Sequence, residues 1–191
     1  MASSVPPSSH RVPSFEVAFD GGRVRPWVPA DAVSLVSHAD NPRVARFLST
    51  RFPSPYTPAD AADWFAFLAS QDDPEGWAIE IGGEAVGGIG LRRGDAEFAH
   101  SAELGYWLGE AHWGRGLMTR VVSAVLAKVV TRWCLRRVTA YAATANHASI
   151  RVLEQAGFER EGLMRARAIR DGEVQDHLVF GWIAQAVSRN S

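Results

Sequence analysis

The chain has 191 residues, of which 47% are hydrophobic and 21% are charged. This length and composition fit one globular domain with a sizeable buried core. The net charge of −1 excludes the broad basic surface that binds nucleic acid or an anionic membrane. One cysteine, Cys134, excludes an intramolecular disulfide and a cysteine-based zinc site.

The sequence shows no segment typical of membrane insertion or secretion. No apolar run reaches the length of a membrane helix, and the first residues lack the apolar core of a signal peptide. We therefore expect a cytoplasmic protein with no membrane partner. Residues 1–14 are predicted to be a disordered tail, residues 15–184 a single domain and residues 185–191 a C-terminal tail.

Strand and helix signals alternate along the chain. In order, the predicted elements are a hairpin over 17–27, helices over 29–37, 41–48 and 58–70, strands over 76–81, 85–92 and 96–108, a helix over 117–131, a strand over 137–143, a helix over 146–156, and strands over 158–169 and 174–183. Thr57 is the expected N-cap of the third helix, and Gly157 ends the last one. Asp171-Gly172 is the expected turn between the last two strands.

This order indicates an α/β or α+β fold with a mostly antiparallel sheet of about seven strands and about four helices. The stretch from Ala96 to Ala143 contains a strand–helix–strand crossover. The glycine run from Gly87 to Gly90 is followed by no helix, so we interpret it as a strand with a bulge or a close backbone approach.

The most informative segment joins the strand Glu103–Leu108 to a helix through the loop Trp113-Gly114-Arg115-Gly116. A glycine loop at a helix N-terminus suits phosphate binding, because unpaired N–H groups and the positive end of the helix dipole meet there. A plain turn is the alternative. The loop is not a P-loop, since the only lysine is Lys128, and it is not the dinucleotide motif, since Thr119 stands at the third glycine.

A second polar unit begins at Asn146 and ends at Gly157-Phe158. Asn146 and Ser149 lie three residues apart, so they share one face of the helix near its N-terminus. Either residue alone is explained by helix capping.

Together the strand Glu-x-Gly-Tyr-Trp-Leu, the loop Trp-Gly-Arg-Gly and the helix Asn-x-x-Ser…Gly-Phe resemble the GCN5-related N-acetyltransferase (GNAT) superfamily. In particular, the chain resembles the branch of bacterial enzymes that acetylate N-terminal amines of ribosomal proteins. The resemblance covers about residues 15–184 and implies the GNAT fold with a β-α-β core that binds acetyl-CoA.

The resemblance implies which residues bind acetyl-CoA. Backbone amides of the glycine loop would bind the pyrophosphate, and Asn146 would contact CoA. The central strand would supply a backbone N–H to the oxyanion. The implied cofactor-binding residues are Leu104, Gly105, Tyr106, Trp113, Gly114, Arg115, Gly116, Leu117, Met118, Thr119, Asn146 and Ser149. Met118 departs from the glycine or alanine of the family pattern, which adds bulk near the phosphates.

Direct acetyl transfer needs a proton acceptor for the amine and stabilisation of the leaving thiolate. Glu103 is the candidate base, and strand alternation places it on the face of Gly105 and Trp107; a solvated glutamate is the alternative. Many family members use a tyrosine to protonate the thiolate, but Leu153 stands at that position. In this branch a serine takes the role, so Ser149 is the candidate thiolate stabiliser.

Two tyrosines, Tyr106 and Tyr141, could substitute for Ser149, although core packing is the simpler interpretation of both. Cys134 is expected to be structural and His112 a surface histidine. Arg115 and Arg120 flank the loop and add local charge or are solvated. The histidines show no metal-ligand spacing, so no metal is expected.

The sequence leaves the identity of the acceptor open. A protein N-terminal amine is the first hypothesis; the rivals are a small amine or aminoglycoside, and a non-catalytic acyl-CoA-binding module. Trp64, Phe65 and the proline-rich loop Arg51–Tyr56 fall where the family shapes the acceptor site. The predicted partners are acetyl-CoA and an amine, with no nucleic acid, in a monomer or homodimer.

Overall fold

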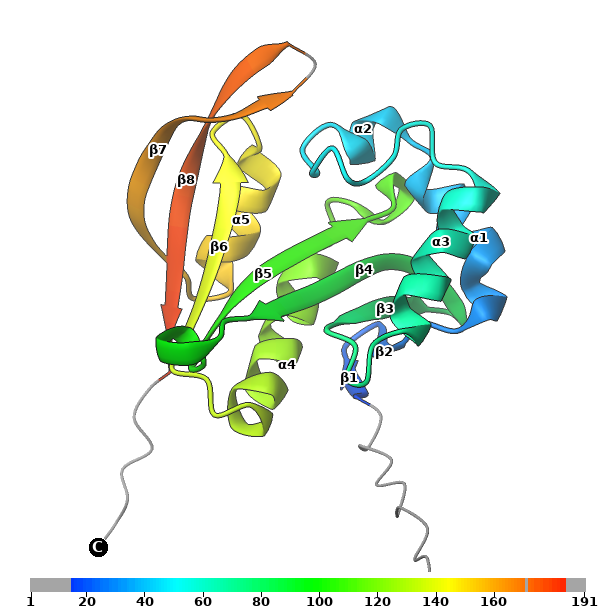
Figure 1. Cartoon of the computed structure of the whole chain (residues 1–191), viewed down its shortest axis with the longest axis horizontal. Coiled ribbons are helices and arrows are strands. Elements are labelled where there is room, and N and C mark those ends of the chain that lie inside the picture. Colours follow the sequence, from blue (N-terminus) through cyan, green and yellow to red (C-terminus); the bar gives the residue numbers. More distant parts are fainter. Residues whose placement is uncertain (1–14, 171, 185–191) are drawn as a thin grey trace, which may run out of the picture.

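The computed structural model describes residues 15–170 and 172–184. These residues form one sheet with the strand order β1-β2-β3-β4-β5-β6-β8-β7 (Figure 1). In chain order the strands are β1 (Val17–Phe19), β2 (Gly22–Pro26), β3 (Gly76–Ile81), β4 (Glu84–Arg93), β5 (Ser101–Leu108), β6 (Arg137–Ala143), β7 (Glu159–Arg170) and β8 (Glu173–Ile183). The α-helices are α1 (Ala32–Ala39), α2 (Pro42–Ala45), α3 (Pro58–Ala69), α4 (Leu117–Arg132) and α5 (His147–Gln155).

The predicted mixed sheet and its crossover are confirmed. Every neighbouring pair of strands is antiparallel except β5 and β6, which α4 connects in parallel. The sheet has 8 strands against the predicted total of about seven; both strands of the predicted 17–27 hairpin are present, and β2 pairs with β3. There are five described α-helices against the predicted total of about four, and the helix expected over 41–48 is α2, a single turn of four residues.

One predicted strand begins later than expected. Residues Ala96–Phe98 form a short 3₁₀ turn, and Ala96 has a φ of 46°. Strand β5 starts only at Ser101, because a left-handed residue interrupts the extended backbone. The expected tails over 1–14 and 185–191, and Asp171 of the last turn, lie outside the described residues.

The two faces of the sheet are covered by different helices. Helices α4 and α5 contribute to the main core, in which the predicted apolar face of α4 is buried. Helices α1 and α3 form a second apolar cluster on the other side, together with Trp107 of β5. Strand β5 is central in the sheet, and its side chains alternate between the two clusters.

Close packing explains the glycine run in β4. A Cβ on Gly87 would lie 2.5 Å from the Trp107 carbonyl oxygen, and one on Gly88 would lie 2.7 Å from the Trp107 indole nitrogen. The register also shifts between Ile79 and Glu80 of the neighbouring β3. The predicted close backbone approach is therefore confirmed, and the irregularity in pairing lies at Val86, just before the run.

Two predicted helix ends are confirmed. Thr57 caps α3 in a capping box, in which the Thr57 N–H donates to the Asp60 carboxylate at 2.8 Å. Gly157 follows α5 with a φ of 87°. Among the described residues, no helix is both long enough and apolar enough to cross a membrane.

Candidate active site

The candidate site lies where β5 and β6 separate. The parallel pairing of these strands begins at Ser101 with Arg137 and stops at Leu104 with Ala140. Strand β5 nevertheless continues to Leu108, paired with β4 on its other edge. The two strands diverge beyond this point (Figure 1), so the last half of β5 has no strand on its β6 side.

Backbone groups of β5 point into this opening. The Gly109 N–H donates to the Val86 carbonyl of β4 at 2.8 Å. Hydrogen bonding alternates along an antiparallel strand, so Gly105 and Trp107 also direct their backbone groups towards β4. Tyr106 therefore directs its N–H and carbonyl to the side where β6 has moved away. This is the place at which the resemblance implied an oxyanion donor.

The side chains of β5 divide as predicted. Glu103, Gly105 and Trp107 share one face, and Trp107 packs against Phe52 with ring centroids 5.5 Å apart. The Glu103 carboxylate accepts a hydrogen bond of 2.6 Å from Arg92 on β4. The Glu103 side chain is 39% exposed, so its carboxylate is reachable from solvent.

The glycine loop ends at the N-terminus of α4. Gly114 and Gly116 have φ values of 74° and 66°, and Gly116 is the N-cap residue. No side chain caps this helix end, so the first N–H groups of α4 remain available to a ligand. Arg115 is exposed in the loop.

Arg120 holds the loop in shape. Its guanidinium donates to the Asp20 carbonyl at 2.8 Å and to the Arg115 carbonyl at 3.2 Å. The sequence predicted that Arg120 either adds charge to the loop or is solvated. The structure shows a different role, because Arg120 links the loop to the β1–β2 turn.

Met118 does not crowd the loop. Its side chain is 7% exposed and belongs to the main core, as does that of Leu117. The added bulk that the sequence placed near the phosphates therefore points into the protein, because the first turn of α4 directs this position at the sheet. Thr119 donates from its hydroxyl to the Gln155 side chain at 3.1 Å, which joins α4 to α5.

Trp113 closes the near end of the loop. Its indole N–H donates to the Leu108 carbonyl at 2.7 Å, so the ring is anchored to the last residue of β5. The ring is 40% exposed, and the guanidinium of Arg43 lies 5.7 Å from its centroid. Trp113 thus fixes the strand end relative to the glycine loop.

A pair of hydroxyl groups bridges β5 and α5. Asn146 caps α5 by accepting the Ser149 N–H on its side-chain oxygen at 3.1 Å. The Ser149 hydroxyl lies 2.9 Å from the hydroxyl of Tyr106. Burial raises the pKa of Tyr106 to about 12, despite the opposing effect of its hydrogen bond with Ser149. The Tyr106 phenol is therefore protonated at neutral pH.

The structure separates the other candidates from this pair. Leu153 is 1% exposed in the main core, which leaves the usual tyrosine position filled by a packing residue. Tyr141 lies on β6, and the guanidinium of Arg167 sits 3.4 Å from its ring centroid. Among the described residues, Tyr106 is the tyrosine that bonds to Ser149.

Cys134 and His112 differ from expectation. Cys134 is exposed, with a φ of 51° in the turn after α4, rather than buried as a structural thiol would be. His112 is partly buried and contacts the His38 ring at 5.4 Å, because the short helix before the loop packs against α1. Burial, and then the charge of His38, lowers the pKa of His112.

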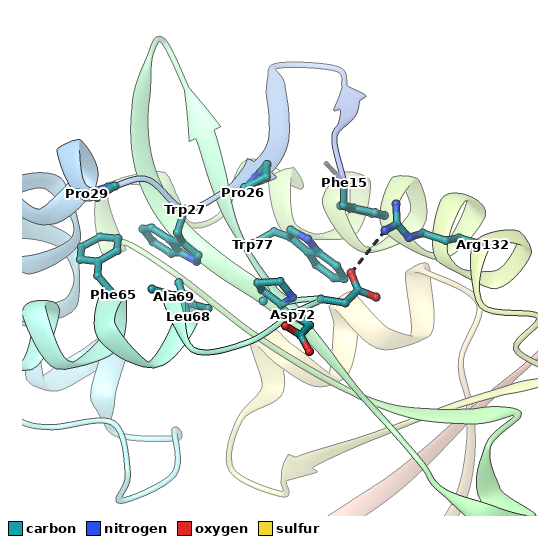
Figure 2. Close-up of a pocket in the computed structure, with 13 residues that line it drawn as sticks. Phe15, Pro26, Trp27, Pro29, Phe65, Leu68, Ala69, Asp72, Trp77 and Arg132 are labelled. Carbon is teal, nitrogen blue, oxygen red and sulfur yellow. Dashed lines mark hydrogen bonds and ion pairs between the residues drawn. The ribbon is translucent and has the colours of Figure 1, made fainter. Parts of the chain in front are cut away.

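A groove of about 320 Å³ lies beside α3 (Figure 2), and no residue of the glycine loop Trp113–Gly116 lines it. Aromatic rings of Trp27, Phe65 and Trp77 line it, and Asp73 pairs with Arg132 at one end. Phe65 belongs to the expected acceptor region, but the predicted catalytic residues do not line the groove. Trp64 and Phe52 do not line the groove, and they pack with Phe65 in the second apolar cluster.

Two contacts at the site were not foreseen from the sequence. The pairing of Glu103 with Arg92 follows from the register of β4 and β5, which the sequence leaves open. The position of Arg167 over Tyr141 depends on an irregular register between β7 and β8. Within the described part of the chain, no group of three or more histidine, cysteine or acidic side chains is placed to hold a metal ion.

Known proteins share this architecture. Residues 23–159 match the family model described as Acetyltransferase (GNAT) domain. The probable N-acetyltransferase YjcK of Bacillus subtilis is 39% identical over 80 residues, which cover 42% of this chain and 44% of YjcK. The [ribosomal protein uS5]-alanine N-acetyltransferase of Escherichia coli is 30% identical over 80 residues, which cover 42% of this chain and 41% of that protein.

A solved structure extends the likeness over nearly the whole fold. Mycobacterium smegmatis RimJ, in complex with CoA-disulfide, aligns with a TM-score of 0.75 and 24% identity, over 92% of this chain and 89% of that one. At this identity the likeness shows the fold. The aligned segment spans less than half the length of each of the two curated relatives.

Proposed function

Because the chain belongs to the GNAT acetyltransferase family, we propose that it transfers the acetyl group of acetyl-CoA to a primary amine, and that the amine is a protein N-terminus. The observation that carries this proposal is the opening between β5 and β6, bordered by the uncapped N-terminus of α4 and the Tyr106–Ser149 pair. The name of the Escherichia coli relative supports the choice of an N-terminal amine.

Binding of CoA would rest on the backbone rather than on side-chain charge. The unpaired N–H groups at Leu117, Met118 and Thr119, with the positive end of the α4 dipole, would hold the pyrophosphate. Gly114 and Gly116 let the phosphates approach, since neither carries a Cβ. Asn146 would contact CoA beside the thioester while it caps α5.

The reaction makes a bond between nitrogen and the acetyl carbon and breaks the bond between that carbon and sulfur. The amine must first be neutral, and a protein α-amine has a pKa of about 8, well below the lysine value of about 10.4. In our proposal Glu103, directly or through water, takes the proton that the amine loses. Its exposed position on the face of Gly105 leaves room for an acceptor.

Backbone and hydroxyl groups would stabilise the charges that form. The Tyr106 N–H, directed into the opening, would donate to the oxyanion of the tetrahedral intermediate. The Ser149 hydroxyl would donate to the departing thiolate. The protonated Tyr106 hydroxyl would donate to the Ser149 oxygen, which orients the serine proton towards sulfur.

Release of free thiol from acetyl-CoA tests the proposal. The purified chain should release thiol with peptides that have a free N-terminus and should not do so with the same peptides blocked at the N-terminus. An aminoglycoside and a simple diamine test the small-amine alternative. Tight binding of acetyl-CoA with no turnover on any acceptor would instead favour a non-catalytic module.

A further inference from the structure

The distal end of the β7–β8 hairpin reaches across to the segment that follows α2 (Figure 1). The contact is a hydrogen bond of 2.9 Å from the Arg170 guanidinium to the Leu48 carbonyl, between residues 122 positions apart. It brings two arginine-rich segments together. Arg46 and Arg51 flank Leu48, and Arg165 and Arg167 precede Arg170 on β7.

Arg167 borders the opening between β5 and β6. Glu103 of β5 is in register with Thr139 of β6, so their side chains share one face of the sheet. Tyr141 is two residues further along β6, beyond the last pair with β5, and lies on the same face. The Arg167 guanidinium lies 3.4 Å from the Tyr141 ring centroid, which places its charge on the Glu103 side of the opening.

We call Arg46, Arg51, Arg165 and Arg167 the arginine rim of the opening. These arginines differ from most others in the described fold. Arg23, Arg25, Arg43, Arg92, Arg93, Arg137 and Arg160 each pair with a carboxylate. Within residues 15–170 and 172–184, no carboxylate lies within ion-pair distance of Arg46, Arg51, Arg165 or Arg167. All four side chains are exposed to solvent, so their charges are accessible to a ligand.

Acidic residues also lie near these arginines, and Glu173 of β8 is in register with Arg170. Asp176 of β8 accepts the Ala166 N–H at 2.8 Å, which holds the irregular part of β7 in place and leaves the carboxylate its charge. Glu103 accepts from Arg92. Burial, and then the charge of Arg167, lowers the pKa of His177, so this neighbour adds no second charge at neutral pH. The rim is therefore locally cationic on a chain whose net charge is −1.

We propose that Arg165 and Arg167, with Arg46 and Arg51 across the opening, bind carboxylates of the acceptor, and that the preferred acceptor is an N-terminal peptide with Asp or Glu in the residues after its amine. The inference rests on the proposed function and names the substrate class of that same site. Guanidinium groups bind carboxylates in a bidentate manner. The hydrogen bond from Arg170 to the Leu48 carbonyl holds the two arginine segments close to each other.

Three peptides of equal length test this preference. They start with the same free serine or alanine and carry Glu and Asp, Gln and Asn, or Lys and Arg at positions two to five. The acidic peptide should show the highest kcat/KM, mainly through a lower KM, and the advantage should shrink as salt is raised. Equal kcat/KM for the acidic and neutral peptides would overturn the inference.

Variants assign the effect to the rim. Arg167→Ala should raise the KM of the acidic peptide about fivefold and leave that of the neutral peptide unchanged, with a larger rise for Arg165→Ala/Arg167→Ala. Arg136→Ala is the matched control, because Arg136 is exposed next to the opposite end of β6. Equal changes for both peptides in the Arg167 variant would overturn the role of that residue. The acetyl-CoA Kd and the Tm report whether the variant is folded.

The carboxylates that the arginines bind could belong to a peptide or to a free amino acid, and a free acidic amino acid as acceptor distinguishes the two. Its turnover should fall well below that of the acidic peptide, and the opposite order would overturn the peptide assignment. The proposed function fails in a different way, since it predicts thiol release with at least one free amine. Turnover that is equal for all three peptides keeps the acetyltransferase and removes only the acidic preference.

Discussion

The hydroxyl groups of Tyr106 and Ser149 lie 2.9 Å apart and join the central strand β5 to the N-terminal turn of α5. The usual tyrosine position of the family holds Leu153, which is buried in the core. A tyrosine hydroxyl nevertheless reaches the site, from a strand instead of a helix. Because burial raises the pKa of Tyr106 to about 12, this hydroxyl keeps its proton at neutral pH.

Loss of either hydroxyl should slow the reaction more than it weakens CoA binding. Ser149→Ala removes the proposed donor to the thiolate, and we expect kcat to fall by about 10²-fold. Tyr106→Phe keeps the ring and removes the hydroxyl that bonds to the Ser149 hydroxyl and, at 3.3 Å, to the Ser149 carbonyl oxygen. A lost hydrogen bond is worth about 1 kcal/mol, so kcat should fall by about fivefold. Steady-state kinetics and the CoA Kd of both variants provide the measurement.

The double variant Tyr106→Phe/Ser149→Ala tests whether the two groups act together. If Tyr106 acts through Ser149, the second substitution should cost nothing more once the serine is gone. Fully additive losses would show that Tyr106 contributes independently. An unchanged kcat in both single variants would contradict the thiolate role.

The acceptor base should show itself in the dependence of rate on pH. Glu103→Gln should lower kcat/KM by about 10²-fold at pH 7, where most of the α-amine is protonated. The deficit should shrink above about pH 8, because the amine then loses its proton without help. Arg92→Gln is the control: it removes the Glu103 partner but keeps the carboxylate. A pH-independent deficit would argue for a purely structural role.

Substitution of Gly116, the glycine at the start of α4, should weaken CoA binding, whereas an equally strained substitution elsewhere should not. Gly116→Ala puts a Cβ on a residue with a φ of 66°, 3.3 Å from the Arg120 guanidinium, and should weaken CoA binding about tenfold. Gly82→Ala carries the same strain, about 1 kcal/mol, at a φ of 62° in open space. Calorimetry should show an altered Kd for CoA only in Gly116→Ala. Equal CoA Kd values for the two variants would contradict the role of the loop in CoA binding.

Acid should destabilise the fold partly through Glu80. Hydrogen bonds from Arg23, and then from Arg25, hold the pKa of Glu80 below its usual value. A carboxyl with a lowered folded-state pKa stabilises the protein above its unfolded pKa of about 4.3, and this stability is lost as pH falls through the folded value. Glu80→Gln should therefore lower the Tm at pH 7 and flatten its decline below about pH 5.

A matched variant shows whether this acid effect is specific. Glu97→Gln removes an exposed carboxylate from the short helix before β5 and should leave the Tm profile unchanged. Thermal melts at a series of pH values give both curves. Identical profiles for Glu80→Gln and the unmodified chain would contradict the stabilising role of this carboxylate.

Much of the fold could be predicted from local signals. The apolar spacing in residues 117–131, the N-cap at Thr57 and the left-handed Gly157 each act through neighbours in sequence, and each is confirmed. The 3₁₀ turn at Ala96 could not be predicted, because Gly94 marks a break just before it and residues 96–98 themselves carry no glycine or proline to continue that break. A left-handed alanine is uncommon, so residue propensity does not predict it.

Individual residues of the site could be predicted from the sequence, but the contacts between distant elements could not. The sequence motifs place Ser149 and Asn146 on one helix face, as the structure has them. The bond between Ser149 and Tyr106 depends on how α5 packs against β5, residues 43 positions apart. The inward direction of Met118 likewise depends on the rotation of α4 about its axis, which apolar spacing defines only approximately.

The most direct test of the central claim is mass spectrometry of a peptide that contains both a free N-terminus and a lysine, after incubation with the protein and acetyl-CoA. Our proposal predicts one added acetyl group on the α-amine, thiol release in equal amount, and no reaction when the N-terminus is blocked. Acetylation of the lysine alone, or tight acetyl-CoA binding with no acetylation of any amine, would contradict it.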